Sequence, residues 1–321
     1  MKLLKNPADP GYPVEYLLSR IKGRRSRLTR DWRPFLFGPT QQESQVSRGT
    51  SGAQKDRSSD AAWRNLMKEY QWVYSQMNAQ LRAIFAFYFL YAELRTICIG
   101  LRHLADKKAG AINELLDRSL LGDEVKDALA SSADLPAAVR EVERLFSALS
   151  ENFMGLGETL ESGGLRSVEQ RLVETCLSVT ISSRLHPLMR EFFSRIIDAR
   201  NIMALYKYLR FELKSAPLFI PGGSIGEMRL KEIMAKDDLP ALGALVRGFT
   251  GSAVERPDPT SIELALYRGM TRWLRKEGRD PFGVAPLLDY LWRCSIEAMN
   301  ASVLYHTRDL EREFVTAELV Q

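Results

Sequence analysis

Few residues in this sequence have types and spacings that could support chemistry. The three histidines, His103, His186 and His306, are isolated from one another and from any cysteine at ligand spacing, so no zinc site is predicted. The segment Gly222-Gly223-Ser224 precedes an expected helix and could bind an anion through its backbone amides, but a plain capped turn is the commoner use of such residues. Phosphate-binding glycine loops and the Gly-x-Ser-x-Gly nucleophile motif are absent from the sequence. The sequence therefore predicts no catalytic residue, cofactor or metal.

One pair of neighbouring acids, Asp237 and Asp238, resembles the paired aspartates of helical prenyl-transfer enzymes. A second aspartate pair is missing, because Ala241 and Leu242 follow instead. We therefore expect the two acids to be negative charges in the first turn of a helix, where they are favourable. An α-helical enzyme of this kind stays as an alternative hypothesis.

Positive charge is concentrated at the N-terminus. The chain has 321 residues and a formal charge of +5, and residues 1–33 hold nine Lys and Arg against three acids, so this segment carries +6 and the rest of the chain −1. A general nucleic-acid binder more often spreads its basic surface over the folded body.

The basic segment has the pattern of an amphipathic helix. Apolar residues recur on one helical face, namely Val14, Leu17, Leu18, Ile21 and Leu28. Arginines cover the other face, and the candidate interface residues among them are Arg20, Arg24, Arg25 and Arg27. Such a helix could dock on the protein core, lie on an anionic bilayer or contact phosphates. A docked helix with a solvated basic face is the commonest outcome, and a nucleic-acid-binding or scaffold protein is the alternative.

Composition indicates a folded chain. The apolar fraction of 45% is too high for a disordered protein and sufficient for a core. The three cysteines, Cys98, Cys176 and Cys294, are far apart and odd in number, so reduced thiols are expected. The longest apolar run, Ala83 to Ala92, has ten residues. A bilayer needs about 20, so no membrane span is predicted.

The spacing of apolar residues predicts helices almost throughout, and therefore an all-α protein. Long helices are expected over 61–104, 134–152, 166–213, 260–277 and 283–306, with breaks inside the first and third, and shorter ones near 109–118, 123–131, 225–236, 238–248 and 308–320. The polar stretch 38–60 is expected to be a loop. Capping boxes from Ser224 to Glu227 and from Thr260 to Glu263 predict two helix starts, and Asp134 precedes another.

One pattern recurs in three of the long helices: an aromatic residue, an acid five residues later, Asn or Thr three later, and a base six later. The first copy is Tyr88, Glu93, Thr96 and Arg102, the second is Phe193, Asp198, Asn201 and Lys207, and the third is Trp292, Glu297, Asn300 and His306. The copies are offset by 105 and 99 residues, which predicts three helical units over residues 1–130, 131–250 and 251–321.

Helical geometry limits what this repeat can do. The acid and the Asn or Thr lie on one face, where they can bond each other or a common partner. The base lies about half a turn around the axis from the acid. The repeat therefore predicts helices that bury an aromatic face and satisfy their inward polar groups pairwise, not a catalytic cluster.

Four segments carry a resemblance to a known family. They are Tyr16 to Arg24; Ile197 to Ile202, which contains Asp-x-x-Asn, with Tyr208-Leu209-Arg210; Phe219 to Gly223; and Pro281-Phe282-Gly283 with Tyr290, Leu291, Glu297 and Asn300. Together they resemble the C-type subunit of the V/A-type rotary ATPases, which in eukaryotic V-ATPases is the d-type subunit. The chain departs from the family at Ala301-Ser302, where Leu-Arg is frequent, and residues 38–60 look like an insertion.

The resemblance implies three similar helical bundles in a funnel-like arrangement around a pseudo-threefold axis. It implies a non-catalytic subunit without a cofactor, on the cytoplasmic end of the membrane rotor ring. Such a subunit transmits torque between the ATPase head and the ring during proton or sodium transport. The expected partners are the central-stalk subunits and the rotor ring, with no nucleic acid and no membrane span.

Overall fold

The computed structural model of the chain describes residues 3–29, 31–32, 34–35, 59–211, 215–251, 253–254, 258–281, 283–307, 315–316 and 318–320. Within these residues the regular secondary structure is twelve α-helices and one short 3-10 helix, with no β-strand. The prediction of an all-α protein is confirmed. Residues 38–58 of the expected loop 38–60 lie outside the described residues. Most of the expected last helix, 308–320, lies outside them as well.

Two compact units make up the chain, and each is assembled from separate parts of the sequence. The first unit comprises Met1–Gly11, Tyr70–Ile197 and Ile220–Gly223, and the second comprises Tyr12–Glu69, Asp198–Phe219 and Ser224–Gln321. The division between the units falls within helices α4 (Ser59–Gln76) and α10 (Pro187–Phe211), so each of these helices belongs partly to the first unit and partly to the second. The threefold division expected from the repeat stays a prediction.

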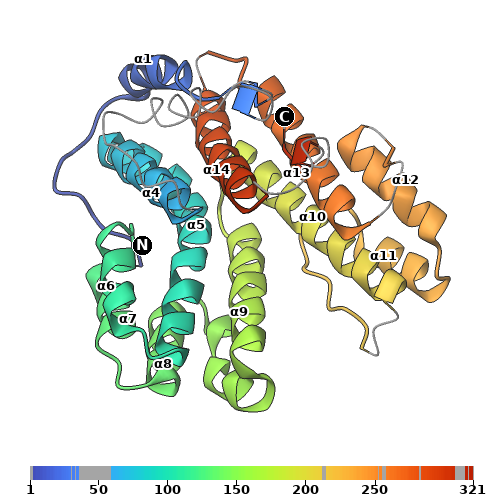
Figure 1. The fold of residues 1–321 in the computed structure, drawn as a ribbon, viewed down its shortest axis with the longest axis horizontal. Coiled ribbons are helices and arrows are strands. Elements are labelled where there is room, and N and C mark those ends of the chain that lie inside the picture. Colours follow the sequence, from blue (N-terminus) through green and yellow to red (C-terminus); the bar gives the residue numbers. More distant parts are fainter. Residues whose placement is uncertain are drawn as a thin grey trace. The chain divides into compact units, whose positions relative to one another are not determined.

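Helix α5 (Ala79–Ala105) is the central helix of the first unit. It packs against α6 (Ala109–Asp117), α7 (Asp123–Ala130), α8 (Leu135–Ser147) and α9 (Leu156–Ser182), as Figure 1 shows. In the described part of the chain, α5 is the one helix long and apolar enough to cross a membrane, yet 56% of its most apolar stretch is buried inside the protein. This burial is typical of a core helix.

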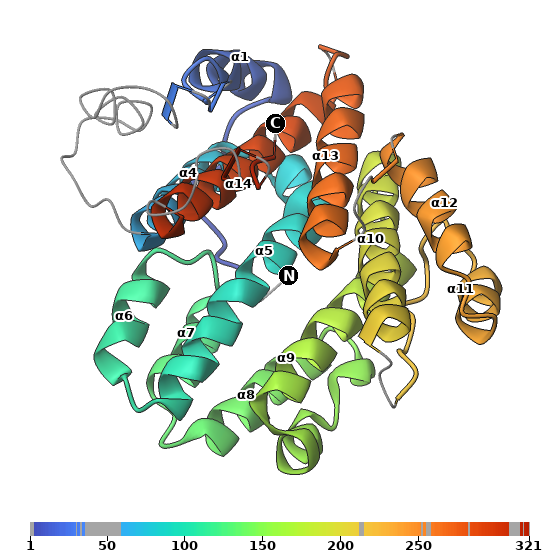
Figure 2. The same ribbon diagram turned by 45° about the vertical axis from the view of Figure 1, so that its right-hand side comes forward.

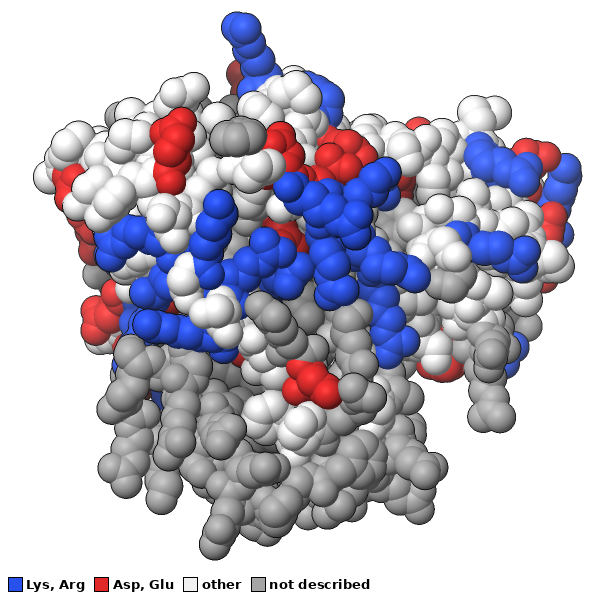
Figure 3. Space-filling model, turned by 90° about the horizontal axis from the view of Figure 1, so that it is seen from above, with Lys and Arg blue, Asp and Glu red and all other residues white. Residues whose placement is uncertain are grey.

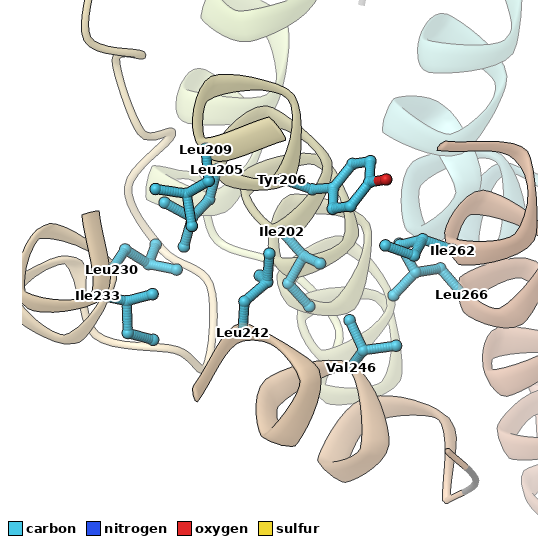
Figure 4. Close-up of a cluster of buried hydrophobic side chains, with 10 residues drawn as sticks. All are labelled: Ile202, Leu205, Tyr206, Leu209, Leu230, Ile233, Leu242, Val246, Ile262 and Leu266. Carbon is cyan, nitrogen blue, oxygen red and sulfur yellow. The ribbon is translucent and has the colours of Figure 1, made fainter. Parts of the chain in front are cut away.

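The second unit is built around a cluster of buried apolar side chains, drawn in Figure 4. The cluster joins the second half of α10 to α11 (Glu227–Ala235), α12 (Leu239–Thr250) and α13 (Pro259–Glu277), which Figure 2 shows near one another. Its members are Ile202, Leu205, Tyr206, Leu209, Leu230, Ile233, Leu242, Val246, Ile262 and Leu266. The unit is completed by α14 (Ala285–His306) and by α1 (Val14–Arg25), which packs on α14.

Several helix boundaries follow from identifiable caps. Asn78 divides the expected helix 61–104, because its side-chain oxygen accepts a hydrogen bond from the Leu81 amide (2.9 Å) and so starts α5. Asp134 caps α8 in the same way through the Ala137 amide (2.8 Å), as expected. The expected helix 166–213 divides before Pro187, where α10 begins.

Other boundaries differ from the expectations. Helix α9 begins at Leu156, ten residues before the expected start, and it contains the non-helical residue Gly164. The 3-10 helix Glu151–Phe153 precedes it. The N-cap of α13 is Asp258 rather than Thr260, because its carboxylate accepts from the Ser261 amide (3.0 Å). A carboxylate is the stronger acceptor, so it displaces the hydroxyl cap.

Candidate functional site

The acids of the threefold repeat lie on three helices, and each binds a segment remote in sequence. Glu93 lies on α5 in the first unit, while Asp198 on α10 and Glu297 on α14 lie in the second. The side chains of Glu93 and Asp198 are fully buried, and Glu297 is partly buried. A buried carboxylate is costly unless it accepts hydrogen bonds, so the partners decide what each acid does.

Glu93 binds the turn that precedes α7. Its Oε1 accepts the backbone N–H of Leu120 at 2.5 Å, and the Thr96 side chain also bonds it. Burial raises the pKa of Glu93 to about 7, although the Leu120 amide and Thr96 oppose the shift. Burial, with Lys5 close by, lowers the pKa of Lys126 to about 8. The Glu93 side chain is therefore a proton-binding group near neutral pH.

Asp198 binds the turn that precedes α11. Its two oxygens accept the Ser224 amide (3.0 Å), the Ser224 hydroxyl (2.5 Å) and the Ile225 amide (3.0 Å). The expected capping box at Ser224 is therefore wrong: Gly226 is the N-cap of α11, and the Ser224 hydroxyl donates to Asp198 instead. Of the Gly222-Gly223-Ser224 amides that could have bound an anion, that of Ser224 is held by the protein's own carboxylate.

The first two copies of the repeat use the same spacing. Glu93 and Leu120 are 27 residues apart, and so are Asp198 and Ile225. In both copies a short helix follows, α7 in the first and α11 in the second. The first two copies therefore share the spacing between acid and bound amide, although α6 stands between α5 and the turn in the first copy only.

The third copy binds a different part of the chain. Glu297 Oε1 accepts the amide (3.1 Å) and the hydroxyl (2.8 Å) of Thr29, which follows α1. Burial and the neighbouring charge of Glu69 raise the pKa of Glu297, against the opposing effect of Thr29. One turn further along α14, Asn300 bonds both backbone groups of Val320, at 2.8 and 3.0 Å.

The remaining repeat positions divide between buried and exposed faces. The buried members include Tyr88, Thr96, Phe193, Asn201 and Trp292. The Tyr88 hydroxyl lies 3.0 Å from that of Tyr70, and the Trp292 ring N–H donates to the Thr271 hydroxyl at 2.9 Å. The three bases lie at the surface: Arg102, which pairs with Glu169 through two bonds of 2.6 Å, Lys207 and His306. Acids and bases therefore do not meet, as helical geometry predicts.

The basic helix α1 docks on the second unit through its apolar face and two arginines. Leu17, Leu18 and Ile21 are its buried residues. Arg24 pairs with Glu69 at 2.7 and 2.5 Å, and Arg25 pairs with Asp289 at 2.5 Å. Burial of the α1 apolar face therefore matches the expectation of a docked helix.

Two carboxylates receive the α1 arginines inside the unit. Glu69 also accepts the Tyr290 hydroxyl at 2.6 Å, and burial raises the pKa of Tyr290. Asp289, whose side chain is fully buried, is also paired with Arg293 at 2.9 Å. The hydrogen bond to Glu69 raises the pKa of Arg24 and keeps it charged.

The four candidate interface residues thus have different surroundings. Arg24 and Arg25 are half-buried in ion pairs, which removes two arginines from any phosphate-binding surface. Arg20 and Arg27 are exposed, and the Arg20 guanidinium lies 5.8 Å from the ring centre of Tyr16. Their role in binding a partner stays a prediction.

Other expected chemical groups are used structurally. Asp238 is the N-cap of α12, accepting the Ala241 amide at 2.8 Å, so it lies one position before the first helical turn. In the described residues, no group of three or more His, Cys, Asp or Glu side chains could hold a metal ion. Cys98, Cys176 and Cys294 form no disulfide with one another.

A comparison with protein families matches residues 44–305 to the ATP synthase (C/AC39) subunit family. The chain belongs to this family. No individual curated protein matches the sequence. Membership of the C/AC39 family makes the chain a subunit of the V/A-type ATP synthase family, and it associates the chain with a membrane complex.

Sequence reasoning missed several residues that hold this C/AC39 protein together. Glu69 joins α1 to α14, but its partners are 45 and 221 residues away, and no local pattern identifies it. Glu143 on α8 accepts the amides of Gly155 and Gly157, both at 2.9 Å, at the start of α9. The signal that could have found such groups is an isolated acid on an apolar helical face, as at Glu93.

Proposed function

We propose that the chain is a non-catalytic subunit that couples the central stalk of a V/A-type ATPase to its membrane ion-translocating ring. The coupled process is proton or sodium transport linked to ATP hydrolysis or synthesis. The observation that carries the proposal is the family match, which covers residues 44–305. The partners are the central-stalk subunits and the rotor ring of the same complex, and the subunit lies at the cytoplasmic surface of the membrane.

The internal bonding of the helices supports a mechanical role. A subunit that transmits torque has to resist deformation, and here long helices are tied to distant segments by carboxylates that accept backbone amides. Hydrogen bonds to charged groups contribute about 1.5–3 kcal/mol each, roughly twice the value for neutral pairs. Three such ties stiffen the connections between helices.

The use of the acids also supports a non-catalytic role. Glu93, Asp198 and Asp238 each accept at least one backbone amide within the protein. Each of these acids is used to hold a turn or a helix start of the fold, which supports a structural role for it.

Binding to the neighbouring subunits tests the proposal. The purified full chain is immobilised and incubated separately with the central-stalk subunits and with the detergent-solubilised rotor ring. A helical protein of similar size and charge serves as the control for adsorption. Retention of both partners supports the coupling role, and retention of neither contradicts it. Binding of RNA or DNA that falls steeply with salt would instead support the nucleic-acid alternative.

A further inference from the structure

A basic surface lies where α1, the end of α13 and the start of α14 come together in the second unit. Figure 3, viewed from the side on which α1 lies uppermost in Figure 1, shows Lys and Arg side chains gathered on this face. The exposed bases on α1, at the end of α13 and in the two residues that follow each helix are Arg20, Lys22, Arg27, Arg275, Lys276 and Arg279. We name these six residues the basic face.

One buried carboxylate brings the three segments together. Asp289 at the start of α14 pairs with Arg25 of α1 (2.5 Å) and with Arg293 (2.9 Å). Gly278, which ends α13, lies against the same residue, since a β-carbon there would be 3.0 Å from the Asp289 β-carbon. Because Asp289 is fully buried and paired, it does not offset the charge presented to solvent.

The net charge of the basic face is positive. On the described residues of the same segments, the exposed acids are Glu15, Asp31 and Asp280, half as many as the exposed bases. The side chains of Arg27 and Lys276 are both exposed to solvent. An excess of like charges held together by the fold creates a field that attracts an anionic surface.

The mode of contact follows from what α1 has already buried. Leu17, Leu18 and Ile21 pack inside the unit, so α1 cannot insert an apolar face into lipid. Tyr12, just before α1, and Tyr16 on it are 37% and 47% exposed, and their ring centres lie 4.5 Å apart. Tyrosines beside arginines are typical of protein surfaces at the lipid headgroup level.

We propose that the basic face binds the phosphate headgroups of an anionic bilayer by electrostatic attraction. This adds a direct lipid contact to the proposed function, and it depends on the surface alone, so it holds for the isolated chain. A cluster of four to eight Lys and Arg on a helix is the usual sign of such binding, at roughly 1 kcal/mol per residue near the surface.

Vesicle binding by the purified full chain tests this. Vesicles of phosphatidylcholine with about 30% phosphatidylserine should retain the chain at about 50 mM salt, and pure phosphatidylcholine should not. Salt at about 0.5 M should release it, because the Debye length shortens to a few ångströms. Absence of binding to the anionic vesicles overturns the proposal.

Two triple variants with the same net charge locate the surface. The test variant carries Arg27→Glu, Arg275→Glu and Lys276→Glu, which changes the formal charge from +5 to −1. The control makes the same change at exposed arginines elsewhere: Arg140→Glu, Arg166→Glu and Arg247→Glu. The test variant should bind anionic vesicles about 100-fold more weakly than the wild type, by the per-residue value above. The control should bind within about threefold, because its charges lie outside the contact.

The outcomes separate lipid from protein partners. Equal weakening in both variants would mean that net charge alone acts, and it would overturn the basic face as the site. Binding to a poly-glutamate peptide without binding to vesicles would also overturn the proposal, in favour of an acidic protein. Either result leaves binding of the stalk and rotor ring intact, so failure here is distinguishable from failure of the proposed function.

Discussion

Replacing Asp198 by Asn tests whether the buried acids tie remote segments to the long helices. The substitution keeps the size of the side chain but turns one oxygen into an amide group that cannot accept. Two backbone amides and one hydroxyl donate to Asp198, so at least one of these donors loses its acceptor. The other bonds lose their charge-assisted component.

The expected cost follows from this count. Loss of a charge-assisted hydrogen bond costs about 1.5–3 kcal/mol of stability, and each bond whose acceptor becomes neutral contributes roughly 0.5–1 kcal/mol less. Since Ser224 is exposed, water can partly replace Asp198 as its acceptor, so we take the lower end of these ranges. The free energy of unfolding should fall by about 2.5 kcal/mol, a large fraction of the usual 5–15.

Urea unfolding and hydrogen exchange measure the effect. Unfolding at pH 7, followed by circular dichroism, gives the overall change, and mass spectrometry of peptides covering residues 215–226 reports the bound turn. Exchange of the Ser224 and Ile225 amides should accelerate in the variant. Asp237→Asn makes the same chemical change at an exposed acid and should alter stability by less than about 0.5 kcal/mol. Unchanged stability and unchanged exchange in Asp198→Asn would refute the reasoning.

Three further predictions concern other contacts. Burial raises the pKa of Glu93 to about 7 from 4.5, so the stability is full below about pH 4.5 and falls by about 3 kcal/mol as the pH rises through 7. In Glu93→Gln, the urea concentration at the unfolding midpoint should change less with pH over this range than it does in the wild type. Arg25→Ala leaves a buried carboxylate with one partner and should cost about 2 kcal/mol in urea unfolding, against less than about 0.5 for the exposed Arg27→Ala. Gly222→Ala places a methyl group at a φ of +92° and 2.6 Å from a buried side chain, so thermal unfolding should show a loss of stability of about 2 kcal/mol or more. The control Gly243→Ala, in open space on α12, should raise the stability by about 0.5–1 kcal/mol.

The helices were predictable because local signals agreed with one another. Apolar spacing indicated the buried faces, and Asn78 and Asp134 lie at helix starts where their side chains accept a local amide. The start of α9 was not predictable in this way, since Gly155, Gly157 and Gly164 argue against a helix. The structure overrides that local preference with a carboxylate from α8 that binds two of the glycine amides.

The repeat positions were predictable, but their partners were not. Spacing alone placed Glu93, Asp198 and Glu297 on inward faces, and the structure buries all three wholly or in part. The segments they bind lie 26 to 268 residues away, and no helical rule connects positions so far apart. At Ser224 the local rule gave the wrong cap because a charged acceptor, remote in sequence, bonds more strongly than a hydroxyl.

The docking of α1 on α14 sets an order for folding during synthesis. Residues 14–25 are translated well before Asp289, Tyr290 and Glu297, which bind this region. At 5–20 residues per second, the roughly 280 residues between the end of α1 and the end of α14 take about 15–55 s to translate. Until then the apolar face of α1 has no cover, whereas the continuous stretch Tyr70–Ile197 of the first unit is already complete. During that interval the nascent chain carries an uncovered basic amphipathic segment, and premature aggregation is expected to start from it.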